Sequence, residues 1–157
     1  MRRIFITLAL MCVCAVAIHA RLNIEQIFND ACTSDPNVTE AIVTGKAAHK
    51  INSRLERLAF FKADAANYGE MVRKLVLADA HKASGRDLRY SDGVLSYAYI
   101  ALSDPGENSR DKVNTFIYYV ESKRKSHPAT VMVVLLEGSL SAKEQAKIIE
   151  SLKKNKK

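Results

Sequence analysis

Three apolar segments in the second half of the chain constrain the fold more than any other feature. They read "VLSYAYIAL" (94–102), "VNTFIYYV" (113–120) and "TVMVVLLEG" (130–138). Each has the length of a buried strand, and each also fits the buried side of a helix. If the segments are strands, they pair as an antiparallel meander, and if they are helices, the domain is all-α. The fold class therefore depends on these segments.

The segments themselves are compatible with both structures. In the first, Leu95, Tyr99 and Leu102 form one helical stripe, with "SD" before it as a cap and "DPG" after it as a stop. As a strand, it would be apolar on both faces and would need cover on both sides. The second segment also has helical spacing, although "FIYYV" has a strong preference for strands.

The flanking sequence favours helices. A short helix is predicted over 23–32, and apolar residues keep a helical rhythm from Val38 to Lys82, which indicates two helices meeting near residues 66–69 or one bent helix. Ser141 and Glu144 form a capping box at the start of an amphipathic C-terminal helix. We therefore predict an all-α fold, a single helical domain of about five to seven helices. The alternative is α+β, with N-terminal helices, a three-stranded antiparallel meander at 94–137 and a C-terminal helix.

The N-terminus predicts export. Arg2 and Arg3 precede an uncharged apolar run, and small residues offer cleavage after Ala17 or Ala20. We expect a signal peptide at 1–20, a globular domain at 21–152 and a basic tail at 153–157. The mature protein is then secreted and extracellular.

One cysteine remains after removal of the predicted signal peptide. Cys32 has no partner within the mature chain, so the fold must be stabilised by apolar burial and not by internal disulfides. A single cysteine in an oxidising compartment predicts either an interchain disulfide in a homodimer or a buried thiol.

The positive charge of the chain is concentrated at its ends. The sequence has 24 basic and 17 acidic side chains. Two basic residues belong to the predicted signal peptide and four to the tail, which leaves a body that is close to neutral. The tail lysines, with the helix before them, form a candidate site for anionic lipid or glycan surfaces. They are Lys153, Lys154, Lys156 and Lys157. We predict no nucleic-acid partner, since the body has no basic patch interleaved with aromatic residues.

One modification site and no catalytic site emerge from the sequence. Asn37 begins an N-x-T sequon after "SDP" and is a candidate glycosylation site. His, Cys and acidic residues show no metal-binding spacing, and no glycine-rich phosphate loop is present. We therefore predict no catalytic residue, no metal and no cofactor.

These observations predict a small, secreted, non-enzymatic protein that binds a protein partner or an apolar small ligand. The wall of a ligand pocket is predicted within "LAFFKADAANYGEM", where bulky side chains alternate with alanines. The bulky residues are Phe60, Phe61, Tyr68 and Met71. The alternative function is attachment to anionic surfaces through the C-terminal amphipathic helix and the lysine tail.

Overall fold

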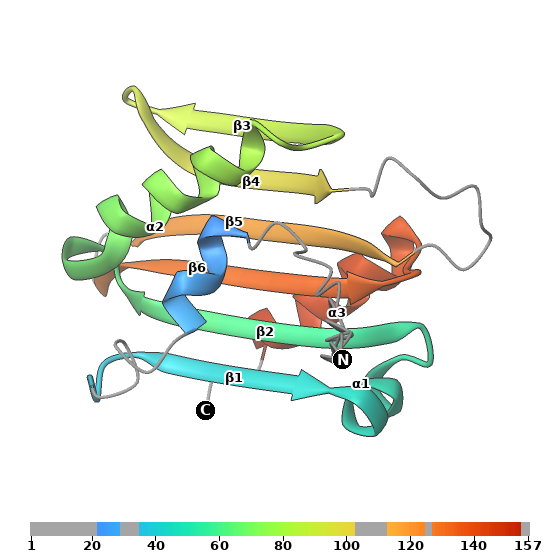
Figure 1. Cartoon of the computed structure of the whole chain (residues 1–157). Helices are drawn as coiled ribbons and strands as arrows, with labels where there is room; N and C mark the ends of the chain where they lie inside the picture. The colour runs from blue at the N-terminus through green and yellow to red at the C-terminus, as the bar shows by residue number, and fades with distance from the viewer. Residues whose placement is uncertain (1–21, 29–34, 103–112, 125–126, 155–157) are drawn as a thin grey trace, which may run out of the picture.

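A six-stranded antiparallel sheet organises the chain (Figure 1). The computed structural model describes residues 22–28, 35–102, 113–124 and 127–154. The strand order is β1-β2-β6-β5-β4-β3, so β1 and β3 are the two edges and β6 lies inside. The strands are β1 (Thr39–Thr44), β2 (Leu55–Asp64), β3 (Gly85–Ser91), β4 (Val94–Leu102), β5 (Asn114–Arg124) and β6 (His127–Gly138).

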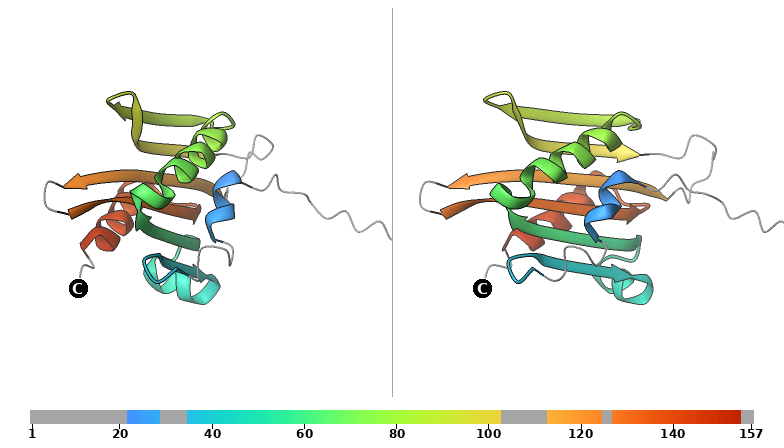
Figure 2. Two further views of the ribbon diagram at one scale, coloured as in Figure 1. Left: turned by 90° about the vertical axis from the view of Figure 1, so that its left-hand side faces the viewer. Right: turned by 60° about the vertical axis from the view of Figure 1, so that its left-hand side comes forward.

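Helices lie against both faces of this sheet. The 3-10 helix η1 (Asn23–Phe28) and α2 (Ala65–Ala80) lie on one face, and α3 (Ala142–Lys154) lies on the other (Figure 2). We call these the α2 face and the α3 face. The short helix α1 (Gly45–Ile51) connects β1 to β2 and packs Ala48 on the α3 side.

Alternation along β6 shows why the sheet needs both layers. Its residues 131–136 are all buried. Val131, Val133 and Leu135 pack under α2, whereas Val134 and Leu136 pack under α3. A strand covered on both faces has a continuous apolar sequence instead of an alternating one. The run "TVMVVLL" is therefore the signature of the central strand.

The predicted all-α class is wrong, and so is the description of the protein as helical. All three apolar segments are strands, and β4, β5 and β6 pair in sequence as the meander of the α+β alternative. The physical reason is that each segment is buried on two faces, so its apolar residues occur at strand and at helix spacing alike. The preference of "FIYYV" for strands was the better guide.

The helical prediction for residues 38–82 is correct only in part. Residues 45–51 and 65–80 form α1 and α2, but β1 and β2 lie where a helix was expected. In β2, Ala59, Phe61 and Ala63 point to the α2 face, whereas Leu58 and Phe60 point to the α3 face. This two-sided burial again imitates a helical pattern. Asp35-Pro36 leads into a turn before β1 and does not start a helix.

A tight hairpin joins β3 to β4. Asp92 and Gly93 have φ angles of 53° and 77°, and two positive angles are required by the type I′ turns that favour Asp-Gly. Close to the turn, the register shifts so that Arg89 faces Tyr97 and Tyr90 faces Leu95, which leaves Ser96 as the extra residue of a β-bulge. The bulge turns Leu95 into the core under α2, while Tyr97 points to the α3 face.

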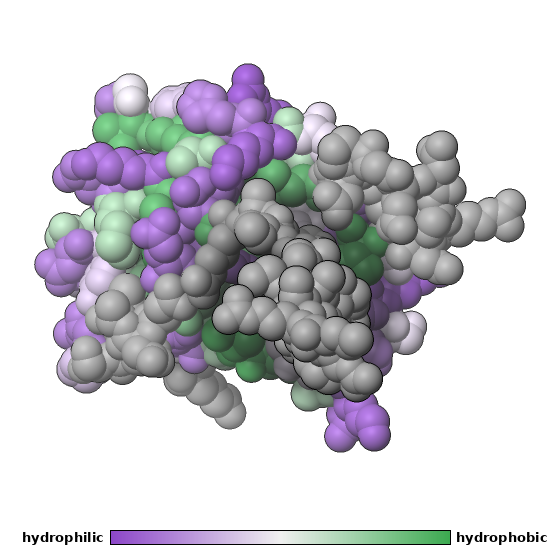
Figure 3. Space-filling view, in the orientation of Figure 1, coloured by the Kyte–Doolittle hydropathy of each residue, from purple (hydrophilic) through white to green (hydrophobic). Residues whose placement is uncertain are grey.

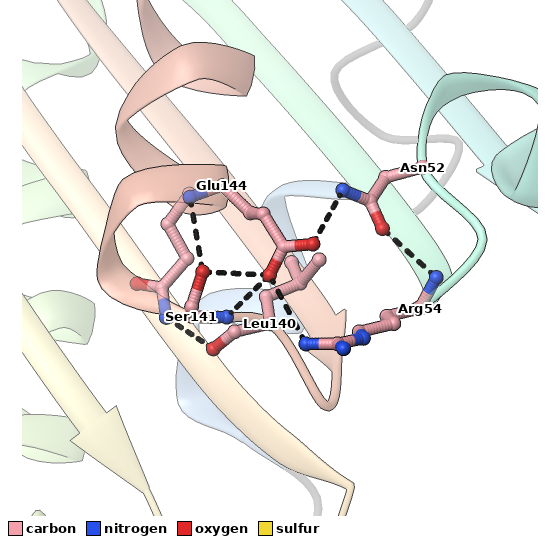
Figure 4. A network of polar contacts seen from close by, with 6 residues as sticks. Asn52, Arg54, Leu140, Ser141 and Glu144 are labelled. Atoms are coloured by element: carbon pink, nitrogen blue, oxygen red, sulfur yellow. Dashed lines mark hydrogen bonds and ion pairs between the residues drawn. The ribbon is translucent and has the colours of Figure 1, made fainter.

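The predicted capping box at the start of α3 is confirmed. The Ser141 backbone N–H and hydroxyl donate to Glu144 Oε2 at 2.8 and 2.7 Å, and Ser141 Oγ accepts from the Glu144 N–H at 3.4 Å (Figure 4). Asn52, in the turn before β2, donates to the other carboxylate oxygen of Glu144 at 3.2 Å. Hydrogen bonds from Ser141 and then from Asn52 lower the pKa of Glu144 to about 2. The cap thus fixes α3 to the end of the sheet.

A buried carboxylate attaches η1 to α2. Asp79 is fully buried and accepts hydrogen bonds from the backbone N–H groups of Asn23 and Ile24 and from the Asn23 side chain, each at 2.8 Å. These contacts satisfy donors that the start of a helix leaves without partners. They also place Ile27 and Phe28 in the core beneath α2. The predicted helix at 23–32 is confirmed over Asn23–Phe28, and its remainder lies outside the described residues.

Candidate functional site

Aromatic side chains cluster on the α3 face where β4 and β5 run side by side. Tyr97 and Tyr118 meet edge to face with ring centroids 5.5 Å apart, and Tyr99 stacks on Phe116 at 6.2 Å. Tyr97, Tyr99 and Phe116 are half-buried, whereas Tyr118 lies beneath them and is buried. We call these four residues, with Arg89 and Asp87 of β3, the tyrosine face.

Charged groups border the aromatic rings. The Arg89 guanidinium lies 4.8 Å from the centre of the Tyr97 ring, and it pairs with Asp87 at 2.8 Å. On the other side, the Lys153 ammonium of α3 lies 5.1 Å from the Tyr118 ring. Cations over aromatic rings add attraction at exposed sites and hold the long side chains in place. The tyrosine face therefore combines apolar ring area with charges of both signs.

Within the described ranges, α3 covers only part of this face. Its Ile148 and Ile149 pack with residues of β2, β5 and β6, and it reaches β4 through Gln145, which accepts a 2.6 Å hydrogen bond from the Tyr99 hydroxyl. In the side views, the helix lies toward β2 and β6 and away from β3 and β4 (Figure 2). Burial raises the pKa of Tyr97 and Tyr99, so both phenols stay neutral at physiological pH.

A small cavity opens on the sheet where β4 and β5 part. The two strands pair only as far as Tyr97 and Val120, and beyond this point the bulge moves β4 away from β5. The cavity has a volume of about 130 Å³. Its lining residues are Ser91, Val94, Leu95, Ser96, Glu121 and Lys123. Val94 is 39 % exposed, and apolar side chains reach the surface at this end of the hairpin (Figure 3).

A polar network lies beside the cavity. Glu121 pairs with Arg73 of α2 and accepts from the Tyr119 hydroxyl at 3.2 Å, and the same hydroxyl lies 3.3 Å from the Leu95 carbonyl. Burial, and then the charge of Glu121, raise the pKa of Tyr119 far above its ordinary value. Its hydroxyl is therefore a donor and not a base. The network joins α2 to β4 and β5, which is a structural role.

The residues of the predicted pocket wall are spread over two sides of the sheet. Phe61 and Tyr68 meet edge to face at 5.9 Å in the core under α2. Phe60 points the other way and packs against the core under α3. Met71 is 39 % exposed on α2. Because neighbouring strand residues point to opposite faces, these four side chains do not line one cavity.

The other predicted sites have different outcomes. Asn37 is exposed in the turn before β1, and its N–H donates to Asp35 Oδ1 at 2.8 Å. Cys32, Lys156 and Lys157 lie outside the described residues. Lys153 pairs with Glu150 at 3.2 Å in addition to its ring contact, and Lys154 is exposed. Glycosylation, the interchain disulfide and the surface contact remain predictions.

The described residues offer neither a metal cluster nor a membrane-spanning helix. In the ranges that the structure describes, no three His, Cys, Asp or Glu side chains converge in a way that would hold a metal ion. Among the helices of those ranges, none is long and apolar enough to cross a membrane.

The sequence analysis missed the tyrosine face. Tyr97 and Tyr99 share one face only in the strand alternative, and the helical prediction separates them. The signal that would have found them is Asp92-Gly93 between the alternating Leu88 and Tyr90 and the apolar run 94–102, because such a pair between alternating apolar residues is the strongest short-range indication of a hairpin. Once β4 follows such a turn, residues two apart lie side by side.

The fold and the site define an α+β protein. Helices lie on both faces of its antiparallel sheet, and one aromatic area stays partly exposed beside α3. Residues 10–149 match a family described as a family of unknown function (DUF6108), and the chain belongs to this family. No curated protein matches the chain. No solved structure matches it either.

Proposed function

We propose that this protein works by binding a second protein through the tyrosine face, outside the cell and without catalysing a reaction. The observation that carries the proposal is the half-buried aromatic area of Tyr97, Tyr99 and Phe116 with Arg89 at its border. Tyrosine and arginine are enriched among the residues that dominate protein–protein binding energy. The predicted signal peptide supports the extracellular location.

The rigidity of this face supports the same proposal. Tyr97 and Tyr99 stand on an inner strand, and their rings contact Tyr118 and Phe116 on the next one. Side chains that are already ordered lose little conformational entropy on binding. The partner that suits this surface offers apolar groups to the rings and polar groups to Arg89 and Asp87.

The two other predicted modes of binding fit the geometry less well. The cavity of about 130 Å³ is smaller than the roughly 300 Å³ at which small-molecule pockets begin, and four of its six lining residues are polar or charged. An amphipathic helix that binds lipid must present its apolar side to the membrane. In α3, Ile148 and Ile149 are already packed on the sheet.

Site-specific photo-crosslinking in the native organism tests the proposal. A photoreactive phenylalanine analogue is placed at Tyr97 and, as a control, at Lys74, whose side chain is 74 % exposed on α2. We expect one crosslinked product of defined mass from position 97 and none from position 74. Excess unlabelled protein should suppress this product.

Competition by variants identifies the face. Tyr97→Ser/Tyr99→Ser competitor should bind at least about tenfold more weakly than wild type, because truncating interface tyrosines costs more than about 1.4 kcal/mol. Met71→Ser, which alters an exposed apolar side chain on α2, should compete as well as wild type. Equal products from both positions, or equal competition by all variants, would contradict the proposal.

A further inference from the structure

The edge strand β3 is open along its whole length. It pairs with β4 on one side, and among the described residues no strand lies on the other side. All of its residues are exposed except Leu88, which is half-buried against the core under α2. An open edge presents backbone N–H and C=O groups that can pair with another strand.

The direction of these backbone groups follows from the hairpin. The Arg89 carbonyl accepts from the Ser96 hydroxyl of β4 at 3.2 Å, so the backbone groups of Arg89 point toward β4. Backbone groups alternate in direction along a strand, and the bulge adds its extra residue to β4 and not to β3. Those of Arg86, Leu88 and Tyr90 therefore point outward, away from the sheet.

The charges of β3 select one way of pairing two copies of this strand. In an antiparallel pair with a two-fold axis at Leu88, Asp87 of each copy lies opposite Arg89 of the other. A shift of the axis to Asp87 places two aspartates opposite each other, and a shift to Arg89 places two arginines opposite each other. Opposite charges across strands stabilise a pair and like charges destabilise it.

We infer that two copies of the chain associate edge to edge through β3, antiparallel, with the two-fold axis at Leu88. The charge pattern selects this arrangement over the registers centred on Asp87 and Arg89, and the backbone direction allows it, since Leu88 points its N–H and C=O outward. A two-fold interface must be complementary to itself, and the sequence "RDLRY" meets this condition. At both ends of this segment, Arg86 of one copy lies opposite Tyr90 of the other, which places a cation beside an aromatic ring.

The contacts within one copy prepare this pairing. Arg89 and Asp87 are already joined at 2.8 Å, and both side chains are largely exposed, at 68 % and 47 %. In the dimer, the two pairs meet and form a cluster of four alternating charges on the α3 face. Charged residues on an edge strand usually oppose pairing. In β3, the alternation of Asp87 and Arg89 opposes the registers centred on either of these residues and favours the register centred on Leu88.

The other edge of the sheet lacks this property. Strand β1 reads "TEAIVT" and carries a single charged residue, Glu40. Any two-fold pairing of β1 places Glu40 opposite a neutral residue or opposite its own copy. Edge-to-edge association through β3 also brings the two tyrosine faces side by side on one continuous sheet, because Asp87 and Arg89 lie next to Tyr97 and Tyr99.

Sedimentation velocity of the purified chain over a range of concentrations tests the inference. A reducing agent is present throughout, so that a Cys32 disulfide cannot contribute. We expect a concentration-dependent dimer for wild type. Asp87→Arg and Arg89→Asp, each alone, should raise the dissociation constant at least about 100-fold, because each places like charges opposite each other.

Mixing the two single variants provides the decisive comparison. Asp87→Arg supplies two arginines and Arg89→Asp supplies two aspartates, so an equimolar mixture should form a heterodimer at wild-type strength, visible by native mass spectrometry. The double variant, with both residues exchanged, should dimerise alone. A defect in the folding of one variant would not be repaired by mixing.

A charge reversal elsewhere serves as the control. Glu70→Lys removes the exposed pair with Lys74 on α2 and should leave the dimer unchanged. A wild-type chain that stays monomeric at every concentration would overturn the inference. So would single variants that dimerise like wild type, or a mixture that shows no heterodimer.

Discussion

The central strand β6 and the edge strand β3 belong to one sheet but follow opposite rules. Residues 131–136 of β6 are buried on both faces, whereas only Leu88 of β3 is even half-buried. In β6, a change at any of these side chains disturbs a packed core, under α2 or under α3. In β3, a change of side chain alters mainly groups that are already exposed to solvent. The stability of this fold is thus concentrated at the centre of the sheet, and its edge is free to carry recognition.

The largest test of this difference compares two leucines. Leu135→Ala leaves a cavity at a fully buried position of β6 and should lower the free energy of unfolding by about 4 kcal/mol. Leu88→Ala in β3 should cost no more than about 1 kcal/mol, because Leu88 is packed on one side only and part of its side chain is already exposed to solvent. Urea denaturation followed by circular dichroism measures both. Equal effects would show that the edge contributes as much to stability as the centre.

A pair of glycines sharpens the comparison. At Gly138, where β6 ends with φ of 152°, an added Cβ would lie 2.1 Å from the Arg54 carbonyl oxygen. Gly138→Ala should therefore cost about 3 kcal/mol through overpacking and backbone strain. At Gly85, where β3 begins, the added Cβ would lie 3.8 Å from the Ala101 Cβ. Gly85→Ala should change stability by less than about 0.5 kcal/mol, and a larger loss in thermal denaturation would contradict the open edge.

The smallest effect concerns the helix that follows β6. The pKa of Glu144 is lowered to about 2 in the folded chain, against roughly 4.3 in an unfolded one. Ionised Glu144 therefore stabilises the fold above the unfolded pKa, and this contribution is lost as the pH falls through the folded value. Glu144→Gln should lower stability at neutral pH and flatten its decline between about pH 5 and 2.

The matched control is Glu150→Gln, at an exposed position on the same helix. It should leave the acid-dependent decline close to that of wild type. Melting temperatures recorded across the acid range give the comparison, and equal profiles for the wild type and Glu144→Gln would contradict the role assigned to the cap.

The same contrast explains how far the sequence predicts the fold. Local signals act within a few residues, and the two that specify α3, Ser141 and Glu144, were interpreted correctly. The apolar runs of β4, β5 and β6 were recognised as buried, but whether they form strands or helices depends on layers supplied by distant segments. A strand covered on both sides loses the alternation that distinguishes it from a helix.

One local signal was available and was interpreted differently. The sequence "YSDGVL" places Asp92-Gly93 directly before a strand, but Ser91-Asp92 was interpreted as a possible helix cap. When Asp92-Gly93 is interpreted as a hairpin turn, it predicts both β3 and β4. The tyrosine face then follows from the spacing of Tyr97 and Tyr99, whereas its position outside the cover of α3 depends on packing between residues far apart in the chain.

The attachment of η1 to Asp79 has a consequence for the order in which the chain is made. Asn23 and Asp79 are separated by 56 positions, so the first helix has no docking site until α2 has been synthesised. If residues 1–20 direct export, the segment behind them gains its docking site only after the chain up to Asp79 has been made. The long-range contact at the N-terminus thereby postpones the folding of this leading segment.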